Sequence, residues 1–399
     1  MRVAFITSCL EPGKDGVGDY SRDLAAACLT HGWDPLLIAL NDAYVGAPVE
    51  EIQAARGVAI QALRLPASSP WHERVLATRC FLQQRPVDWI SLQFVCYGFH
   101  SKGITIGLGR HLPPLIADRR LHVMLHELWI GIRRGASLRE RVVGSIQRRA
   151  VCSLVARLNP AAVHTSNAGY ARLLGDVGIH ARVLPLCGSI PILADADTGW
   201  LEQELLKLGA MRPAETPRSD QWRFGFFGTL PDPWSPEPLF TYIAETAERA
   251  GRAVAVISIG RIGTGEGLWR KMQARYGHRF CFARLGERSA AEVSMFLQSI
   301  DFGIATTPWQ MIGKSASAAA MLDHGLPVIV SRDDVDIGAD GLEDHDPLLQ
   351  RMTPALPQWL LQVRRRAPRD SLAALSARFT ACIRAVEMLQ PLGRGRSIT

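Results

Sequence analysis

The chain has 399 residues. A single hydrophobic core rarely supports a chain of this length, so the length predicts two domains. Hydrophobic residues make up 47% of the sequence, yet no apolar run reaches the roughly 18 residues that span a bilayer, so we expect no membrane-spanning helix. The net charge is +7, and the eight cysteines are scattered without a C-x-x-C pair. These features argue against a nucleic-acid partner, a metal centre and disulfides, and we expect a cytoplasmic protein.

Strand-like and helical runs alternate along the first half of the chain. Short apolar runs predict strands, and longer runs with one apolar face predict helices. This alternation predicts a parallel sheet with helices on both faces. The expected strands are residues 3–7, 36–40, 60–65, 89–94, 123–125, 163–165 and 183–186, and the expected helices are residues 20–30, 73–83, 138–156 and 170–174.

A proline-containing stretch of mixed charge, residues 188–218, separates this pattern from a second one and predicts a linker with a short helix at 200–208. The second pattern has expected strands at 223–228, 254–259, 280–285, 302–306 and 328–330, and expected helices at 238–250, 268–276, 290–297, 314–322 and 371–389. We therefore expect an α/β protein of two doubly wound, Rossmann-like domains that face a cleft. The expected parts are a first domain at 1–190, a linker at 191–220, a second domain at 221–370 and a C-terminal helical segment at 371–399 that crosses back to the first domain.

The unusual loops of the sequence all follow expected strands. Ligands of open α/β sheets bind beyond the carboxyl ends of the strands, so these loops predict a site between the two domains. The first of them, residues 13–18, has glycines spaced G-x-x-G-x-G, which disfavours a dinucleotide site but would let backbone N–H groups approach a phosphate. The others are residues 93–98, 126–131, 165–167, 228–234, 260–265, 285–287 and 308–317.

The turn Gly313-Lys314-Ser315 precedes a run of helix-forming residues. Free N–H groups of a first helical turn, the hydroxyls of Ser315 and Ser317, and the ammonium of Lys314 would together form a cradle for an anion. An ordinary helix capped by Ser315 is an equally consistent interpretation.

Two further groups of residues suggest chemistry. His126 and Glu127 end an expected strand, where His126 could polarise a hydroxyl and Glu127 could tune it, although a hydrogen-bonded structural histidine is the simpler alternative. The arginine-rich stretch 133–149 could touch anionic lipid at the inner face of a membrane, although a solvated helix face explains it as well. Asp334 and Asp336 have the spacing of a metal-binding pair, but a solvated loop is favoured.

Several blocks resemble glycosyltransferase family 4 enzymes of the GT-B fold. They are DGVGDYSRDLAAACLTHGWDP, HELWIG, HTSNAGYARLL, FGFFGTLPD, LGERSAAEVSMFLQSIDFGIATTPW and IGKSASAAAMLDHGLPVIVS, and they span residues 1–332. The resemblance implies a glycosyltransferase with a nucleotide-diphosphate sugar as co-substrate, no other cofactor and no metal, and with retention of anomeric configuration. It also implies that the first domain binds the acceptor, a hydroxyl-bearing carbohydrate, lipid-linked or small molecule, and that the second binds the donor.

The resemblance also assigns residues to roles. His126 would lie near the donor sugar as the catalytic residue, assisted by Glu127. The expected acceptor residues are Tyr97, Trp129 and Asn167. The expected donor residues are Gly16, Val17, Gly18, Gly228 and Thr229 at the diphosphate, Leu285 and Gly286 at the base, Lys314, Ser315 and Ser317 at the phosphates, and Asp323.

The sequence departs from the family at two places. Ile312 and Ala320 stand where the family has two glutamates, the second of which grips the ribose, and Asp323 one turn later is a candidate substitute. The basic pair expected after the first strand of the second domain is missing from GTLPDPW, and Lys314 would supply that charge. These departures leave two alternatives open: a non-catalytic sugar-nucleotide-binding subunit of a transferase complex, and a nucleotide-sugar epimerase on the same fold.

Overall fold

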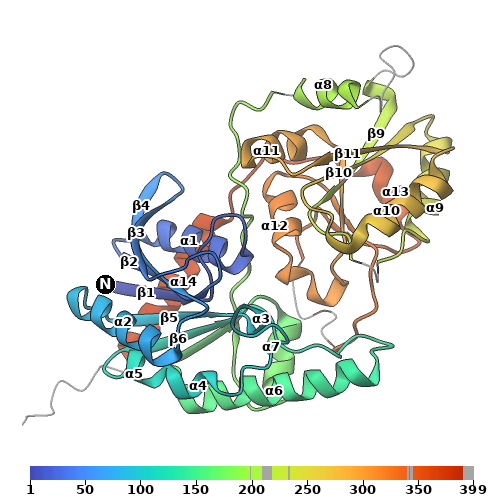
Figure 1. Cartoon of the computed structure of the whole chain (residues 1–399). Helices are drawn as coiled ribbons and strands as arrows, with labels where there is room; N and C mark the ends of the chain where they lie inside the picture. The colour runs from blue at the N-terminus through green and yellow to red at the C-terminus, as the bar shows by residue number, and fades with distance from the viewer. Residues whose placement is uncertain (198, 209–217, 232–233, 339–340, 342–344, 390–399) are drawn as a thin grey trace, which may run out of the picture. The chain divides into compact units, whose positions relative to one another are not determined.

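The computed structural model describes residues 1–197, 199–208, 218–231, 234–338, 341 and 345–389. The chain divides into two compact units, each built on its own sheet (Figure 1). The first unit comprises Met1–Leu186, Asp336–Leu342 and Leu372–Thr399, and the second comprises Cys187–Val335 and Glu343–Ser371.

The sheet of the first unit has eight strands in the order β3-β4-β2-β1-β5-β6-β7-β8. Every pairing is parallel except that of β3 with β4, so the sheet is mixed rather than wholly parallel as predicted. The strands are β1 (Arg2–Thr7), β2 (Asp34–Asp42), β3 (Val49–Ala55), β4 (Val58–Pro66), β5 (Trp89–Phe94), β6 (Arg120–Leu125), β7 (Ala162–Thr165) and β8 (Arg182–Val183).

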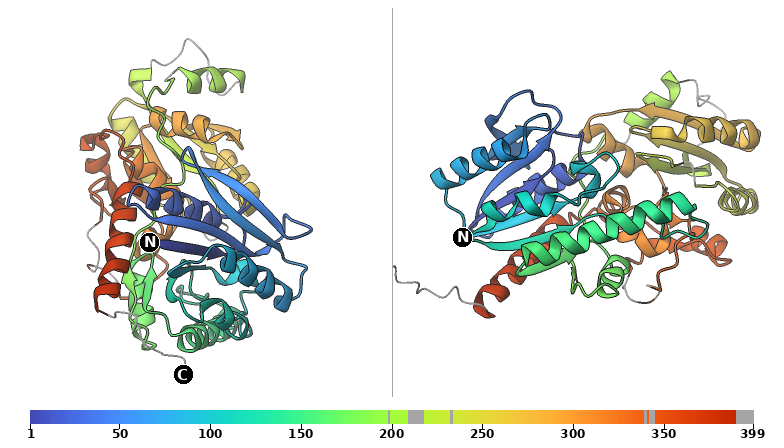
Figure 2. Two further views of the ribbon diagram at one scale, coloured as in Figure 1. Left: turned by 90° about the vertical axis from the view of Figure 1, so that its left-hand side faces the viewer. Right: turned by 60° about the horizontal axis from the view of Figure 1, so that its bottom comes forward.

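The antiparallel strand β3 was not predicted. Its sequence VEEIQAA has polar residues at three of its seven positions, and only two of the seven residues are buried, so it lacks the apolar run of the other strands. The turn to β4 uses Arg56 at φ 50° and Gly57 at φ 78°, the left-handed pair of a two-residue hairpin. This hairpin stands at the edge of the sheet (Figure 2).

Helices cover the sheet of the first unit. The helix α1 begins at Gly16, four residues earlier than predicted, because Asp15 caps it. The final helix α14 packs against α1 and places Phe379 against Phe5 of the sheet, with ring centroids 5.8 Å apart. The helices are α1 (Gly16–Leu29), α2 (Trp71–Gln84), α3 (Cys96–Phe99), α4 (Leu108–His111), α5 (Pro113–Ile116), α6 (Leu138–Leu158), α7 (Ala168–Gly175) and α14 (Leu372–Leu389).

The second unit has a six-stranded parallel sheet in the order β11-β10-β9-β12-β13-β14. The short strand β14 and the helix α13 were not predicted. The strands are β9 (Gln221–Phe227), β10 (Ala253–Ile259), β11 (Phe280–Gly286), β12 (Phe302–Ala305), β13 (Val328–Val330) and β14 (Leu349–Arg351). The helices are α8 (Trp200–Lys207), α9 (Leu239–Arg249), α10 (Glu266–Tyr276), α11 (Ala290–Ser299), α12 (Ala316–Asp323) and α13 (Leu356–Gln362), with 3₁₀ turns η1 (Arg218–Asp220), η2 (Gly263–Gly265) and η3 (Trp309–Lys314).

Both faces of the second sheet are buried. Along β10, Val254 and Val256 belong to one apolar cluster, and Ala255, Ile257 and Ile259 belong to another on the opposite face. A strand that is covered on both sides needs apolar residues at every position, which explains why β10 reads as an unbroken apolar run in the sequence. The carboxyl ends of the central strands are therefore fixed by packing on both sides.

Candidate functional site

In the first unit, the predicted phosphate loop ends in an acidic helix cap. Oδ1 of Asp15 accepts hydrogen bonds from the backbone N–H groups of Val17 at 2.8 Å and Gly18 at 2.9 Å. A Cβ atom on Gly18 would lie 2.3 Å from the carbonyl oxygen of Cys9, so only glycine fits there, whereas a Cβ on Gly16 would meet open space. Two of the N–H groups expected to meet a diphosphate are thus already paired with a carboxylate.

A buried ion-pair network holds the preceding loop. Asp42 is fully buried and accepts hydrogen bonds from the Leu10 backbone N–H at 3.1 Å and from Nε of Arg64 at 2.8 Å. Burial raises the pKa of Asp42, but the hydrogen bonds from Arg64 and from backbone N–H groups outweigh it, so the net pKa is lowered. Arg64 also reaches Glu11 at 2.5 Å. The loop after β1 is therefore anchored by charged groups whose partners are all within the first unit.

His126 follows β6 and lies beside the first helix. Its Nε2 atom is 2.8 Å from Oε1 of Gln93, and its ring packs edge-to-face against Tyr20 of α1, with centroids 4.9 Å apart. Burial lowers the pKa of His126 to about 3, so the ring is neutral at physiological pH. The structure thus brings His126 together with α1, the helix that carries Gly16–Gly18.

The predicted acceptor residues follow three neighbouring strands. Tyr97 is 41% exposed, and its hydroxyl accepts a hydrogen bond from Gln147 at 3.1 Å. Trp129 is buried, and Glu127 next to His126 is half-buried. Asn167 is fully buried and caps α7 by accepting the N–H of Tyr170 at 2.8 Å, so its side chain is committed to the fold. Of the three, Tyr97 is the most exposed.

In the second unit, small-residue turns meet at the carboxyl ends of β9, β10 and β11. The Gly228 N–H donates to the Ile259 carbonyl at 2.9 Å, and the Gly260 N–H donates to the Gly286 carbonyl at 2.8 Å. Gly228, Gly260 and Gly286 all have positive φ, at 87°, 88° and 71°. We call these three residues with Thr229 the glycine edge. The structure therefore places Gly228, Thr229 and Gly286 along one edge of the sheet, whereas the side chain of Leu285 is buried in the core.

The turn before α12 differs from the predicted helix start. Lys314 ends the 3₁₀ turn η3, and α12 begins at Ala316, with Ser315 as its cap. Oγ of Ser315 accepts the N–H of Ala318 at 3.3 Å and lies 3.2 Å from Oγ of Ser317. The three residues Lys314, Ser315 and Ser317 are thus together at the N-terminal end of α12.

Asp323 lies at the opposite end of α12. Its Oδ2 atom accepts hydrogen bonds from the Gly188 N–H at 3.0 Å and from Oγ of Ser371 at 2.9 Å. Eight helical residues extend about 12 Å, so Asp323 does not lie with Ser315. This placement gives Asp323 a structural role that ties two segments to α12, and ribose contact at Asp323 stays a prediction.

The two positions that would hold glutamates in the resembling family are core positions. Ile312 is 5% exposed and Ala320 is fully buried. A Cβ atom on Gly188 would lie 2.7 Å from Cα of Ala320, so the chain runs directly against this face of α12. The apolar residues at 312 and 320 are therefore explained by packing.

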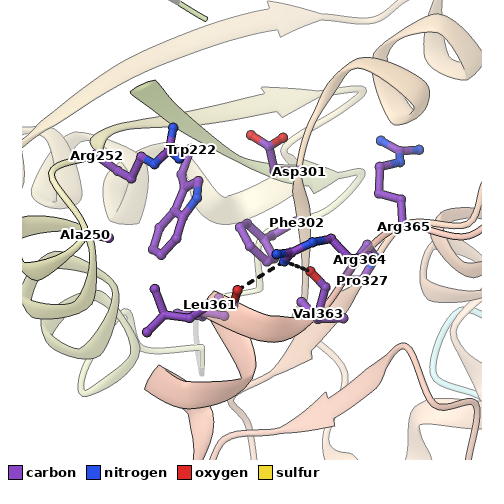
Figure 3. A pocket seen from close by; sticks show the side chains of 11 residues that line it. Trp222, Ala250, Arg252, Asp301, Phe302, Pro327, Leu361, Val363, Arg364 and Arg365 are labelled. Carbon is purple, nitrogen blue, oxygen red and sulfur yellow. Dashed lines mark hydrogen bonds between the residues drawn. The ribbon is translucent and has the colours of Figure 1, made fainter. Parts of the chain in front are cut away.

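A cavity of about 460 Å³ lies elsewhere in the second unit. Trp222 near the start of β9, Phe302 at the start of β12 and Pro327 before β13 line it, together with Arg252 and Arg364 (Figure 3). These residues mark the amino-terminal edge of the sheet, opposite the glycine edge. None of the predicted donor residues lines this cavity.

The remaining predicted features are surface groups. Asp334 pairs with Arg332 at 2.7 Å and Asp336 with Arg134 at 2.6 Å, and within the described ranges no three His, Cys, Asp or Glu side chains gather as a metal site would need. Arg133 pairs with Glu140 at 3.2 Å. None of the helices that the structure describes is long and apolar enough to cross a membrane.

A set of buried polar residues behind His126 was not predicted from the sequence. Ser91 and Gln93 on β5, His122 on β6 and His164 on β7 are all at most 1% exposed and form a hydrogen-bonded chain that ends at His126. Polar residues inside otherwise apolar strands were the one sign of this set in the sequence. Their contact depends on the strand register, which pairs Ser91 with His122 and which the sequence alone does not give.

Comparison with known proteins gives the fold. No family model matches the chain, and no curated protein matches it by sequence. Among solved structures, Anabaena Alr3699/HepE in complex with UDP and glucose is 16% identical, with a TM-score of 0.56 and coverage of 98% of this chain and 100% of that one. The sucrose-phosphate synthase of Thermosynechococcus elongatus is 12% identical, with a TM-score of 0.57 and coverage of 98% and 100%.

A third similar structure carries another activity in its name. It is a Listeria monocytogenes protein provisionally assigned as a UDP-N-acetylglucosamine 2-epimerase, 11% identical, with a TM-score of 0.54 and coverage of 100% of this chain and 99% of that one. Identities this low speak for the fold alone. The likeness runs over nearly the whole of each chain, and both sheets have the doubly wound α/β architecture. The chain has the GT-B fold.

Proposed function

We propose that the chain is a glycosyltransferase that moves a sugar from a nucleotide-diphosphate sugar to a hydroxyl-bearing acceptor. In this proposal it follows glycosyltransferase family 4 and works without a metal and with retention of anomeric configuration. The donor's diphosphate binds at the glycine edge and the turn Lys314-Ser315, and His126 acts at the sugar. Complexes of Anabaena Alr3699/HepE, which has the same fold, with UDP and with UDP-glucose support a nucleotide sugar as donor.

The observation that carries the proposal is the glycine edge. Three glycines with positive φ end adjacent strands of one parallel sheet, which lets a ligand approach the backbone without meeting a Cβ atom. A Cβ on Gly228 or Gly286 would meet nothing within 4 Å, so the space beside both residues is open. The N–H groups of Gly228 and Gly260 donate to carbonyl oxygens, so the charge of an extended diphosphate on this surface would be stabilised by a cation such as Lys314.

A thermal-shift screen of nucleotide-diphosphate sugars tests the donor. A ligand at 100 times its dissociation constant adds about 2.7 kcal/mol to the free energy of unfolding, which gives a measurable shift. We expect nucleotide sugars of one nucleotide base to raise the melting temperature of the protein. No shift with any nucleotide sugar in the wild-type protein would reject the proposal.

An epimerase is the second candidate, because a similar structure bears that assignment. The two activities are separated by their products: an epimerase changes the nucleotide sugar without an acceptor, whereas a transferase releases free nucleoside diphosphate when an acceptor is present. A non-catalytic subunit would bind the donor and do neither.

Peripheral contact of the 133–149 region with anionic lipid is a further part of the proposal, supported by the exposed Arg139, Leu138 and Val142 on one helix.

A further inference from the structure

The chain of hydrogen bonds behind His126 has a defined direction. Gln93 donates from Nε2 to Oγ of Ser91 at 2.7 Å and presents Oε1 to Nε2 of His126 at 2.8 Å. Oγ of Ser91 lies 2.8 Å from Nδ1 of His122, and Nε2 of His122 lies 2.9 Å from Nδ1 of His164. We call these five residues the polar relay.

The contact with Gln93 fixes the proton of His126. Oε1 of Gln93 can only accept, so Nε2 of His126 carries a proton. The hydroxyl of Ser91 accepts from Gln93 and has a second lone pair, so it can either donate to Nδ1 of His122 or accept from it. The contact between His122 and His164 follows that choice, and Nε2 of His164 is buried without a hydrogen-bond partner among the described residues.

The orientation of the Gln93 amide therefore decides the tautomer of His126. If that amide turned over, its NH₂ group would donate to Nε2 of His126, and His126 would carry its proton on Nδ1 instead. Oγ of Ser91 would then donate to Gln93 and accept from Nδ1 of His122. In the orientation that the structure shows, His122 and His164 can hold their protons on either nitrogen, so the tautomer that is fixed is that of His126.

Burial keeps the relay neutral. Ser91, Gln93 and His122 are fully buried, and His164 is 1% exposed. Burial lowers the pKa of His122 well below its ordinary value and that of His164 to about 4, with Arg182 and Arg378 also opposing a positive charge on His164. The aromatic edge of Phe379 from α14 closes over His122, with centroids 5.2 Å apart. A neutral imidazole must choose one nitrogen for its proton, so the relay decides which.

We propose that Ser91 and Gln93 are positioning residues that hold His126 as the Nε2–H tautomer and leave its Nδ1 lone pair to accept a hydrogen bond from a substrate hydroxyl. The Nε2–H form is also the more stable tautomer of free histidine, so the direction given by Gln93 agrees with the intrinsic preference. The consequence for turnover rests on the proposed transferase function, whereas the tautomer itself does not.

Long-range ¹H–¹⁵N correlation spectra of the histidine-labelled full chain at pH 7.5 test the relay, because the two ring nitrogens have distinct shifts in each tautomer. We expect His126 to be protonated at Nε2 in the wild-type protein. Protonation of His126 at Nδ1, or a mixture of its two tautomers, would overturn the inference without the use of any variant.

Ser91→Ala tests the coupling at a distance of two hydrogen bonds from His126. Loss of the hydroxyl frees the amide of Gln93 to turn over, so His126 should become a mixture of tautomers, and Ser91→Thr should restore the single form. Thr78→Val is the control, because it removes a buried hydroxyl that donates to the carbonyl of Arg74 within α2 and has no contact with the relay residues. A single unchanged tautomer of His126 in Ser91→Ala would overturn the coupling.

Turnover supplies an independent readout. If the protein is a transferase, Ser91→Ala should lower kcat by about 10-fold, a fraction of the loss expected for a positioned polarising group, while KM for the donor stays unchanged. A wild-type protein with the expected tautomers but no turnover would reject the transferase and keep the relay. An unchanged kcat in a Ser91→Ala protein that shows mixed tautomers would reject the catalytic consequence of the relay.

Discussion

Asp15 accepts the backbone N–H of Gly18 at 2.9 Å, so a carboxylate occupies part of the loop that would otherwise attract an anion. A helix N-terminus favours negative charge, and here the protein supplies that charge itself. A diphosphate that approached the first turn of α1 would meet a like charge. This hydrogen bond disfavours a diphosphate at Val17 and Gly18 and favours the glycine edge as the diphosphate site.

Asp15→Asn separates the two possibilities. Asparagine caps a helix as well as aspartate does, so the free energy of unfolding should change by less than about 0.5 kcal/mol. If the diphosphate comes near α1, removal of the charge should tighten nucleoside diphosphate several-fold and leave the free nucleoside unchanged. Titration calorimetry with both ligands measures this. Equal affinities before and after the substitution would place the phosphates away from α1.

Lys314→Ala tests the turn before α12. A charge-assisted contact is worth roughly 1.5–3 kcal/mol, so nucleoside diphosphate should bind about 10- to 150-fold more weakly, while the free nucleoside binds as before. Lys271→Ala is the matched control, an exposed lysine on α10. A loss of nucleoside and nucleoside diphosphate affinity by the same factor, or no loss of either, would mean that Lys314 does not contact phosphate.

Ala320→Glu should destabilise the protein rather than restore a ribose contact. Ala320 is fully buried, and Gly188 packs against its backbone, so a glutamate would be an unpaired buried carboxylate without space. We expect a loss of at least about 3 kcal/mol in the free energy of unfolding. Ala290→Glu, at an exposed position in the first turn of α11, is the control and should be nearly neutral. Chemical denaturation measures this loss. An Ala320→Glu protein with the same free energy of unfolding as the wild-type protein would contradict this packing.

Buried neutral histidines predict a loss of stability in mild acid. The pKa of His126 is lowered to about 3 and that of His164 to about 4, whereas an unfolded histidine titrates near 6.5. Below about pH 6.5 the unfolded chain therefore binds protons that the folded chain does not. The stability is complete above pH 6.5 and falls by about 1.4 kcal/mol per pH unit for each such histidine as the pH drops toward 4.

Denaturation curves between pH 7.5 and 5 measure this slope, in a range where most carboxylates stay ionised. His164→Asn should reduce the slope by the contribution of one proton, because asparagine can still accept from His122 and does not titrate. A free energy of unfolding that is constant across this range would show that the histidines are accessible to protons in the folded state.

Packing on both faces made most of the fold predictable. The strands β5 and β13 have the predicted bounds, because a strand covered on two sides is an apolar run with sharp ends. The start of α1 was predicted too late, since Gly16 and Gly18 lower helix propensity and the cap by Asp15 is a local hydrogen bond. The strand β3 escaped because its pairing depends on the turn at Arg56 and Gly57.

The sequence predicted which strand ends carry the candidate site, but not the hydrogen bonds that its residues make. Loops after parallel strands were identified by position, and Gly228 and Gly286 lie at the ends of β9 and β11, the two strands that flank β10. The side chain of Asn167 caps a helix, which competes with ligand binding. The side chain of Asp323 bonds to Gly188 and Ser371, which are far away in the sequence. The polar relay depends on the register of three strands, which the sequence does not state.

The central claim is transfer of a sugar, and one measurement addresses it directly. The protein is incubated with the nucleotide sugar that stabilises it and with a panel of hydroxyl-bearing acceptors, and free nucleoside diphosphate and the acceptor mass are followed together. We predict acceptor-dependent release of nucleoside diphosphate with a matching gain of one sugar on the acceptor. His126→Ala should lower this rate at least ~100-fold with nucleotide affinity retained, and the exposed His180→Ala should not. Nucleoside diphosphate release that is independent of acceptor and of His126, or conversion of the nucleotide sugar without any release, would contradict the account.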